Sequence, residues 1–360
     1  MLDCCRLGAA LALLLCLSAP LAAQTPNGQG TYQPQLTPQQ EAARLRAQQE
    51  ALAQSNQAAA PPVSMQMPPG FPLPADHAQY VESLLDHWQK VSQQVQMYKC
   101  SFRRFEYDTT YVQYRDPQTQ MLAAHLVGFG EVRYAAPDRA RFETHKLMRF
   151  KNPPQTPGGN AEYEVVDGYT TGTQTIHERW VCDGKSILDF DFEQKRMYET
   201  TIPPQLQGNI VESPLPFLFG ANKQDILNKY WVRYVPKYIT DANGQKQLNQ
   251  DEYWLEAYPK KINDSRMYSK LEIILSAKDF MPKAMHLYSP QYNPAKGNYT
   301  SRYFLFEDRQ INGQLAKMQD FFGSFVKPRM PLGWKTVTRQ MGQSQSAALP
   351  PGTHPGGEKR

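Results

Sequence analysis

Residues 76–107, DHAQYVESLLDHWQKVSQQVQMYKCSFRRFEY, decide the fold, because a helical pattern gives way there to an alternating one. Large apolar side chains first recur every three or four residues, at Val81, Leu84, Leu85, Trp88, Val91 and Val95. This spacing predicts an amphipathic helix with one buried stripe, and Asp76 with Gln79 offers a capping box at its start. The pattern then changes to every second residue at Tyr98, Cys100 and Phe102, which predicts a half-buried strand.

The alternation changes phase within this strand, since Phe105 and Tyr107 follow Phe102 out of step across Arg103 and Arg104. Such a shift predicts a β-bulge at the two arginines. Further segments rich in Tyr, Phe, Val and Ile, which strands prefer, are predicted at 126–134, 139–150, 176–182, 187–191, 196–201, 229–239, 252–258, 270–277, 283–289 and 301–308. A polar loop is predicted over about 152–174.

About ten antiparallel strands after one long helix place the chain in the mainly β (α+β) class. The strand series is broken at 203–228, where SPLPFLFG (213–220) leads into residues 223–230. We expect one or two short helices there, apolar on one side. A large curved sheet has a concave apolar face that must be covered, and the long helix and this insertion are natural covers.

The ends of the chain differ in composition from its middle. Residues 1–23 are typical of a signal peptide, with Arg6, an apolar run over 7–17 and a predicted cut after Ala23, so we expect a periplasmic or secreted protein. An uncleaved anchor is the alternative. We expect a disordered Gln/Ala/Pro-rich arm over 24–75, one folded domain over 76–338 and a disordered tail over 339–360.

The sequence offers little for catalysis. A net charge of +5, from 39 basic and 34 acidic residues, argues against a dedicated nucleic-acid binder. The seven histidines show no zinc spacing, and neither a G-x-S-x-G elbow nor a P-loop occurs, so no catalytic residue, metal or cofactor is predicted. Asp189 and Asp191 could act as paired hydrolytic carboxylates, or be two solvent-facing acids. After export, Cys100 and Cys182 remain, either as one disulfide or as two buried thiols.

Several motifs follow one another in a familiar order, namely GEVRYAAP (130–137), DGKSILDFD (183–191), the 213–220 insertion and FMPKAM (280–285). Over residues 76–310 the chain resembles the LolA/LolB-like family of exported lipoprotein carriers, in particular a planctomycete-type branch. The resemblance implies a strongly curved, unclosed half-barrel with an inserted short-helix lid over an apolar cavity for acyl chains. One departure is Ala136, where the family has a basic residue that helps to hold the lid.

A carrier of this kind needs apolar area rather than a catalytic motif, since each buried CH₂ contributes about 0.8 kcal/mol and a neutral hydrogen bond nets about 1 kcal/mol. The expected ligand-binding residues are Trp88, Phe102, Phe142, Trp180, Leu215, Phe217, Leu218 and Phe219. For the first four the alternative is a plain core role, and for the last four a permanent lid.

The expected function is that of a non-enzymatic lipid or lipoprotein carrier that holds an acyl chain or a lipidated protein, with transient membrane contact. The alternative is a periplasmic sensor or adaptor that binds another envelope protein, using the 24–75 arm.

Overall fold

The computed structural model describes residues 66–156, 159–171, 174–204, 222–240, 244–313, 323–328, 330 and 332–340. All of them belong to the second of two compact units, Pro61–Arg360. The predicted signal peptide, residues 24–65 of the predicted arm, Leu215–Phe219 and the tail beyond Gln340 lie outside the described residues. Those predictions therefore stay predictions.

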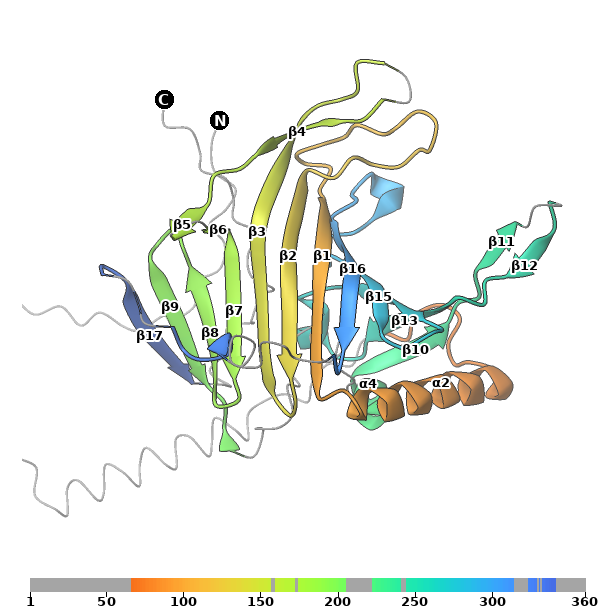
Figure 1. Cartoon of the computed structure of the whole chain (residues 1–360). Coiled ribbons are helices and arrows are strands. Elements are labelled where there is room, and N and C mark those ends of the chain that lie inside the picture. The colour runs from red at the N-terminus through yellow and green to blue at the C-terminus, as the bar shows by residue number, and fades with distance from the viewer. Residues whose placement is uncertain are drawn as a thin grey trace, which may run out of the picture. The chain divides into compact units, whose positions relative to one another are not determined.

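One sheet of thirteen strands dominates the unit (Figure 1). Its order is β10 (Tyr230–Tyr234), β13 (Glu252–Pro259), β14 (Lys270–Ser276), β15 (Pro282–Tyr288), β16 (Ser301–Ile311), β1 (Met97–Tyr107), β2 (Leu126–Ala135), β3 (Arg139–Asn152), β7 (Glu178–Asp183), β8 (Ser186–Asp191), β9 (Arg196–Thr201) and β17 (Lys335–Gln340), with β4 (Glu162–Val165) beside β3. The sheet is not closed, because its end strands β10 and β17 do not pair. The predicted mainly β class and unclosed sheet are confirmed.

The pairing is antiparallel throughout except at one edge, where β17 runs parallel to β9. The residues of β17 were not predicted as a strand, because KTVTRQ is exposed where its burial is described and carries no alternating apolar side chains. Trp334, directly before it, packs with Phe192 and Met330 against a small cluster of Val181, Leu188, Phe190 and Met197. This contact brings the segment to the sheet edge.

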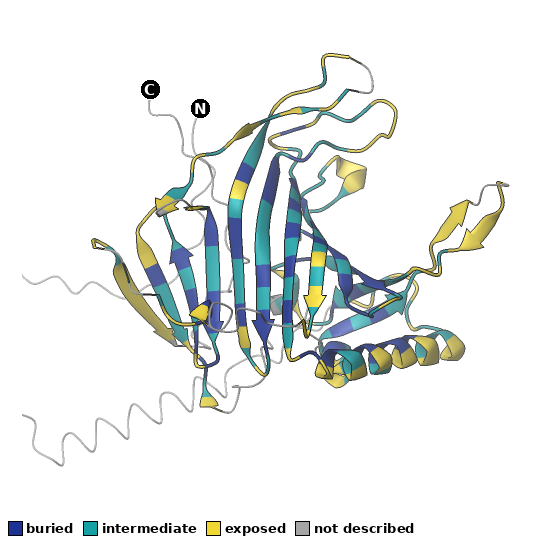
Figure 2. Cartoon of the chain, in the orientation of Figure 1, coloured by how far each residue is buried: buried dark blue, intermediate teal, exposed yellow. Residues whose placement is uncertain are grey.

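Two small hairpins form two-stranded sheets of their own. One joins β5 (Tyr169–Thr171) to β6 (Gln174–Ile176), so it and β4 fall largely within the predicted polar loop. The other joins β11 (Tyr238–Thr240) to β12 (Lys246–Leu248), and every one of its strand residues is exposed (Figure 2).

The long predicted helix is present as α2 (Ala75–Gln93), but its start differs from the prediction. Pro74 is the N-cap and no side chain caps the helix, so the predicted capping box at Asp76 is wrong. Asp76 instead lies in the first turn, where its charge suits the positive end of the helix dipole. No helix among the described residues is both long and apolar enough to cross a membrane.

The other described helices are short: α4 (Lys223–Lys229), α5 (Ile262–Ser265) and the 3₁₀ turn η2 (Pro294–Lys296). Of the predicted lid insertion, only α4 and its flanks are described. Asn222 caps α4, because its side-chain oxygen accepts a hydrogen bond from the Gln224 N–H at 2.7 Å. Ile226 of α4 joins the same core cluster as α2.

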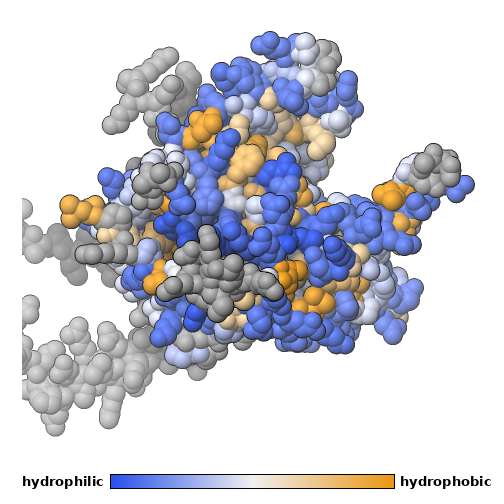
Figure 3. Space-filling model, in the orientation of Figure 1, coloured by the Kyte–Doolittle hydropathy of each residue, from blue (hydrophilic) through white to orange (hydrophobic). Residues whose placement is uncertain are grey.

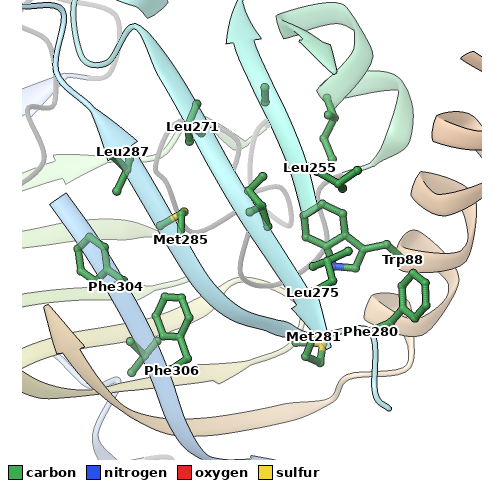
Figure 4. Packing of buried hydrophobic residues seen from close by; sticks show 14 of the residues in the cluster. Trp88, Leu255, Leu271, Leu275, Phe280, Met281, Met285, Leu287, Phe304 and Phe306 are labelled. Atoms are coloured by element: carbon green, nitrogen blue, oxygen red, sulfur yellow. The ribbon is translucent and has the colours of Figure 1, made fainter. Parts of the chain in front are cut away.

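We call the sheet face that packs on α2 the inner face. The α2 stripe of Val81, Leu84, Leu85 and Trp88 lies in one cluster with Tyr98, Cys100 and Phe102 of β1. Phe280, from the β14–β15 turn, belongs to this cluster as well and lies near Trp88 (Figure 4). The cluster continues over β13 to β16 through Leu255, Leu271, Leu275, Met285, Leu287, Phe304 and Phe306.

The predicted bulge at Arg103 and Arg104 is wrong. Burial alternates without a break along β1, and its pairing with β2 stays in register from Met97 to Glu106. Arg104 and Glu106, 3% and 5% exposed, take inner-face positions where the alternation predicts apolar residues. The irregularity in β1 lies elsewhere, in its pairing with β16 between Lys99 and Ser101.

Candidate functional site

A row of phenylalanine rings crosses the inner face. Phe102 of β1 stacks on Phe142 of β3 with ring centroids 4.6 Å apart, and its centroid lies 6.0 Å from that of Phe304 on β16. Phe304 in turn stacks on Phe306 at 6.2 Å. We call these four residues the aromatic row. They form a continuous row of ring contacts across β3, β2, β1 and β16, in which only Phe142 is partly exposed.

The row passes over β2 because that strand has no side chain at Gly130. A Cβ atom there would lie 2.5 Å from Cζ of Phe102 and closer still to the backbone oxygen of Glu143. Both distances are shorter than real contacts allow, so only glycine fits. The bare backbone lets the Phe102 ring reach Phe142 across the intervening strand.

Four of the eight predicted site residues belong to the main core cluster or pack against it. Trp88 and Phe102, each 1% exposed, belong to the main cluster, and Phe142 and Trp180 are partly buried against it. Phe142 and Trp180 are direct partners in the β3–β7 ladder. The other four, Leu215, Phe217, Leu218 and Phe219, lie outside the described residues. Phe304, Phe306 and Met285 were missed, although their alternation within the predicted strands could have indicated the buried face.

Two polar atoms of α2 are buried within this apolar region without a partner. Neither Trp88 Nε1 nor Ser92 Oγ has a hydrogen-bond partner in the described part of the chain. The two residues are four apart, so they lie one turn from each other on the same side of the helix. An unpaired buried donor costs about 1–3 kcal/mol, and an acceptor supplied by a ligand would remove that cost.

The end of the inner face beyond Phe102 carries a buried ion cluster. Arg104 binds both oxygens of Glu178, at 2.5 Å and 3.1 Å, and lies 2.9 Å from Glu106. Thr144 donates to Glu178 at 2.9 Å, and Arg302 lies 3.3 Å from Glu106. Burial disfavours the Glu106 charge, but Arg104 and Arg302 outweigh it, so the pKa of Glu106 lies below its usual value. The charges balance, which makes this cluster a structural one.

The two candidate hydrolytic acids differ in their surroundings. The pKa of Asp189 lies above its usual value, mainly because the carboxyl group is buried. The positive charge of Arg339 lowers this pKa, whereas the negative charges of Asp191 and Glu178 raise it further. Asp191 is occupied with the turn after β8, where its Oδ1 accepts the Gln194 N–H at 2.8 Å. A raised carboxyl pKa is a feature of general acids, but it also arises at structural sites.

A Ser–His–acid arrangement lies on the opposite, outer face. Nε2 of His286 is 3.0 Å from Oγ of Ser301, and its Nδ1 is 3.8 Å from Glu272. The second distance is beyond hydrogen-bonding range, and Ser301 is only 6% exposed. Burial lowers the pKa of His286 to about 4, which keeps the ring neutral. The geometry is that of a packed polar contact rather than of an open nucleophile.

The two described cysteines are free and buried. Cys100 lies on β1 and Cys182 on β7, with β2 and β3 between them. Three strand spacings amount to about 14 Å, twice what a disulfide can bridge. Burial raises the pKa of each thiol to about 12, so both are unreactive. Of the two alternatives left open by the sequence, the structure has the buried thiols.

Among the described residues, no group of three or more His, Cys, Asp or Glu side chains is arranged to hold a metal ion. What the inner face offers is therefore apolar area, unpaired polar groups on α2 and a balanced ion cluster at one end. This combination suits non-covalent binding of an apolar or amphiphilic group.

The main sheet is unclosed, antiparallel except at its β17 edge, and packed against helices. Several solved structures are similar to this fold. One is an uncharacterized conserved protein from Thermus thermophilus, at 9% identity and a TM-score of 0.35, covering 72% of this chain and all of that one. Another is a LolA superfamily protein from Nitrosomonas europaea, at 10% identity and a TM-score of 0.26, covering 64% and 93%.

A third similar structure is that of MucB in its complex with MucA from Pseudomonas aeruginosa, at 11% identity and a TM-score of 0.27, covering 67% of this chain and 60% of that one. Neither a protein-family model nor a curated protein sequence matches the chain. A LolA superfamily structure is thus among those that this chain is similar to. The likeness concerns the fold alone.

Proposed function

We propose that this chain is an exported, non-enzymatic binding protein that holds an acyl chain, free or attached to a lipidated protein, against the inner face. The aromatic row is the observation that carries the proposal. Its rings run without interruption across β3, β2, β1 and β16, and Gly130 removes the only side chain that would interrupt them.

The position of the helices supports binding at one end of the row. The described helix contacts come from α2, α4 and α5, which pack around β10, β13 and the neighbouring half of the sheet. Phe142 and Trp180, on the other half, are only partly buried. An acyl chain lying over Phe142 would extend the apolar cluster, at about 25 cal/mol for each Å² that it removes from water.

Trp88 offers a polar contact on the half of the inner face that α2 covers. Its indole N–H is unpaired in the described residues, and an ester or amide carbonyl at the head of an acyl chain could accept it. A ligand with both an apolar tail and one carbonyl group would therefore satisfy the face better than a pure hydrocarbon.

The test is to purify the full chain under mild conditions, extract it with organic solvent and identify released lipids by mass spectrometry. Binding of a fluorescent hexadecanoyl probe is then measured for the protein and for Phe142→Ala. We expect co-purified lipid and roughly tenfold weaker probe binding by the variant, since losing most of a ring contact costs about 1–3 kcal/mol.

Phe105→Ala is the matched control, because Phe105 is a half-buried ring on the outer face of β1. It should bind the probe as the unchanged protein does. Absence of both extractable lipid and probe binding, with the protein folded by circular dichroism, would overturn the proposal.

A second candidate is an adaptor that binds another envelope protein. The observation in its favour is the β11–β12 hairpin, whose side chains Tyr238, Ile239 and Leu248 are 63%, 44% and 41% exposed. Figure 3 shows hydrophobic residues, in orange, at the surface of this hairpin. A protein partner would cover them. Pull-down from envelope extract with and without residues 238–248 separates this function from lipid carriage, since deletion should abolish capture and leave probe binding unchanged.

A further inference from the structure

A separate cleft lies where the last turns of α2 meet the β14–β15 turn and the end of β16. Its volume is about 320 Å³, at the lower end of the range for small-molecule sites. The helix wall consists of His87, Val91, Gln94 and Val95, and the facing wall of residues 277–280 with Ile311 and Asn312.

The apolar lining of the cleft borders the main core. Val95 and Phe280 are members of the core cluster, and Val91 and Ile311 pack against it. An apolar group placed in the cleft would therefore continue the core rather than lie on polar surface. This is a different location from the aromatic row, whose rings come from β1, β3 and β16.

The facing wall is held in a fixed and unusual conformation. Phe280 has a φ of 53°, a left-handed backbone that an aromatic residue seldom adopts. Its N–H donates to the Ser276 carbonyl at 2.8 Å, and the Arg309 guanidinium donates to the Met281 carbonyl at 2.9 Å. Its ring packs between His87 and Tyr253, with centroid distances of 4.3 Å and 4.8 Å. The wall is thus organised before any ligand arrives.

The charges at the rim favour an anion. Asp279 is paired with Arg309 at 3.1 Å, which compensates its carboxylate. Lys278 is exposed and forms no ion pair with any residue in the described ranges. The cleft therefore combines an apolar floor with one uncompensated cation at its edge.

We propose that this cleft binds a small monocarboxylate with an aliphatic tail, its tail on Val91, Val95, Phe280 and Ile311 and its carboxylate at Lys278. The positive charge of Lys278 favours a carboxylate head group, and the limited volume of the cleft favours a short aliphatic chain over a long one. The site does not depend on acyl binding at the inner face.

The experiment is a calorimetric titration of the full chain with octanoate. We expect saturable binding that is weakened about two- to fivefold by Lys278→Gln, which removes the charge and keeps most of the length of the side chain. Val91→Phe, which fills the cleft, should abolish it. Lys296→Gln, an exposed lysine on η2, is the matched control and should leave binding unchanged. Octanol, which lacks the charge, should bind as weakly to the unchanged protein as octanoate does to Lys278→Gln.

No measurable binding of octanoate, or binding that Lys278→Gln and Val91→Phe leave unaltered, would overturn the inference. The Phe142→Ala variant distinguishes this site from the inner face. It should lose affinity for the hexadecanoyl probe and keep its affinity for octanoate, so either proposal can fail while the other stands.

Discussion

At the scale of single residues, the positions that matter most are those where the inner face departs from a plain apolar pattern. Gly130 is one, because two neighbours already occupy the space of a side chain. Arg104 is another, because a full charge is 3% exposed in the middle of a strand. Each has a near neighbour on β1 or β2 that provides a matched comparison.

Gly130→Ala should destabilise the protein by about 3 kcal/mol or more, since the new methyl group would overlap both the Phe102 ring and the Glu143 backbone. Gly128→Ala, on the same strand, is the control. Its Cβ would lie 3.5 Å from the nearest atom, an ordinary contact, and alanine is favoured over glycine in a strand. Urea unfolding of both variants checks this, and equal effects would contradict it.

Arg104→Met should cost about 3–5 kcal/mol of unfolding free energy, because it leaves Glu178 and Glu106 buried without their partner. Arg103→Met, the preceding residue, removes an ion pair to Glu307 on the outer face. Both side chains of this ion pair are about 40% exposed, so the loss of unfolding free energy should stay below about 1 kcal/mol. Denaturant unfolding of the two variants, compared by their transition midpoints, tests this prediction. A small loss for Arg104→Met would mean that water reaches the buried acids.

At the scale of elements, burial separates those that build the core from those that do not. The α2 stripe and the strands from β13 to β3 contribute most of the buried apolar side chains. By contrast, the strands of the β11–β12 hairpin bury nothing and pair only with each other. A hairpin of two strands is at best marginally stable by itself, so this one adds little to the stability of the sheet.

Replacing residues 238–248 by a short Gly-Ser linker should therefore leave the melting temperature nearly unchanged, because less than about 0.5 kcal/mol of stability is at stake for exposed positions. The contact of Lys237 with Trp254, at 4.6 Å, lies at the base of the hairpin and remains in the shortened chain. Differential scanning calorimetry of the two proteins checks the prediction. A drop of about 5 °C or more would show that the hairpin stabilises the sheet.

At the scale of the whole molecule, stability should fall as the medium is acidified. The pKa of His286 is lowered by burial from 6.5 to about 4, so below pH 6.5 the unfolded chain takes up a proton that the folded one refuses. The loss from this residue reaches about 3 kcal/mol by about pH 4. Paired carboxylates such as Glu106, whose pKa is lowered by nearby arginines in spite of burial, add to the loss below about pH 4.5.

His286→Gln tests this contribution, because glutamine cannot titrate and can still reach the Ser301 hydroxyl. Unfolding free energies measured from about pH 7 to about pH 4 should fall less steeply for the variant than for the unchanged protein. Parallel curves would assign the acid sensitivity to other groups, such as His125 and His177, whose pKa values burial also lowers.

The sequence by itself determined the class of the fold and most of its elements. The α2 stripe and the alternating strands could be placed within a few residues, because apolar periodicity reflects which face of each element is buried. The buried positions of Trp88 and Phe102 followed from the same periodicity. The phase of β1 was misjudged only because Arg104 and Glu106 stand where apolar residues were expected.

Only the tertiary structure decided the rest, because those features depend on pairs of residues far apart in the chain. Arg104 is tolerated inside because Glu178, on another strand, meets it, and Gly130 is required because Phe102 leans over it. The parallel pairing of β17 and the cleft at Phe280 likewise arise where separate elements meet. Periodicity along one strand records burial, but it carries no information on which distant side chain supplies the counter-charge or fills the space.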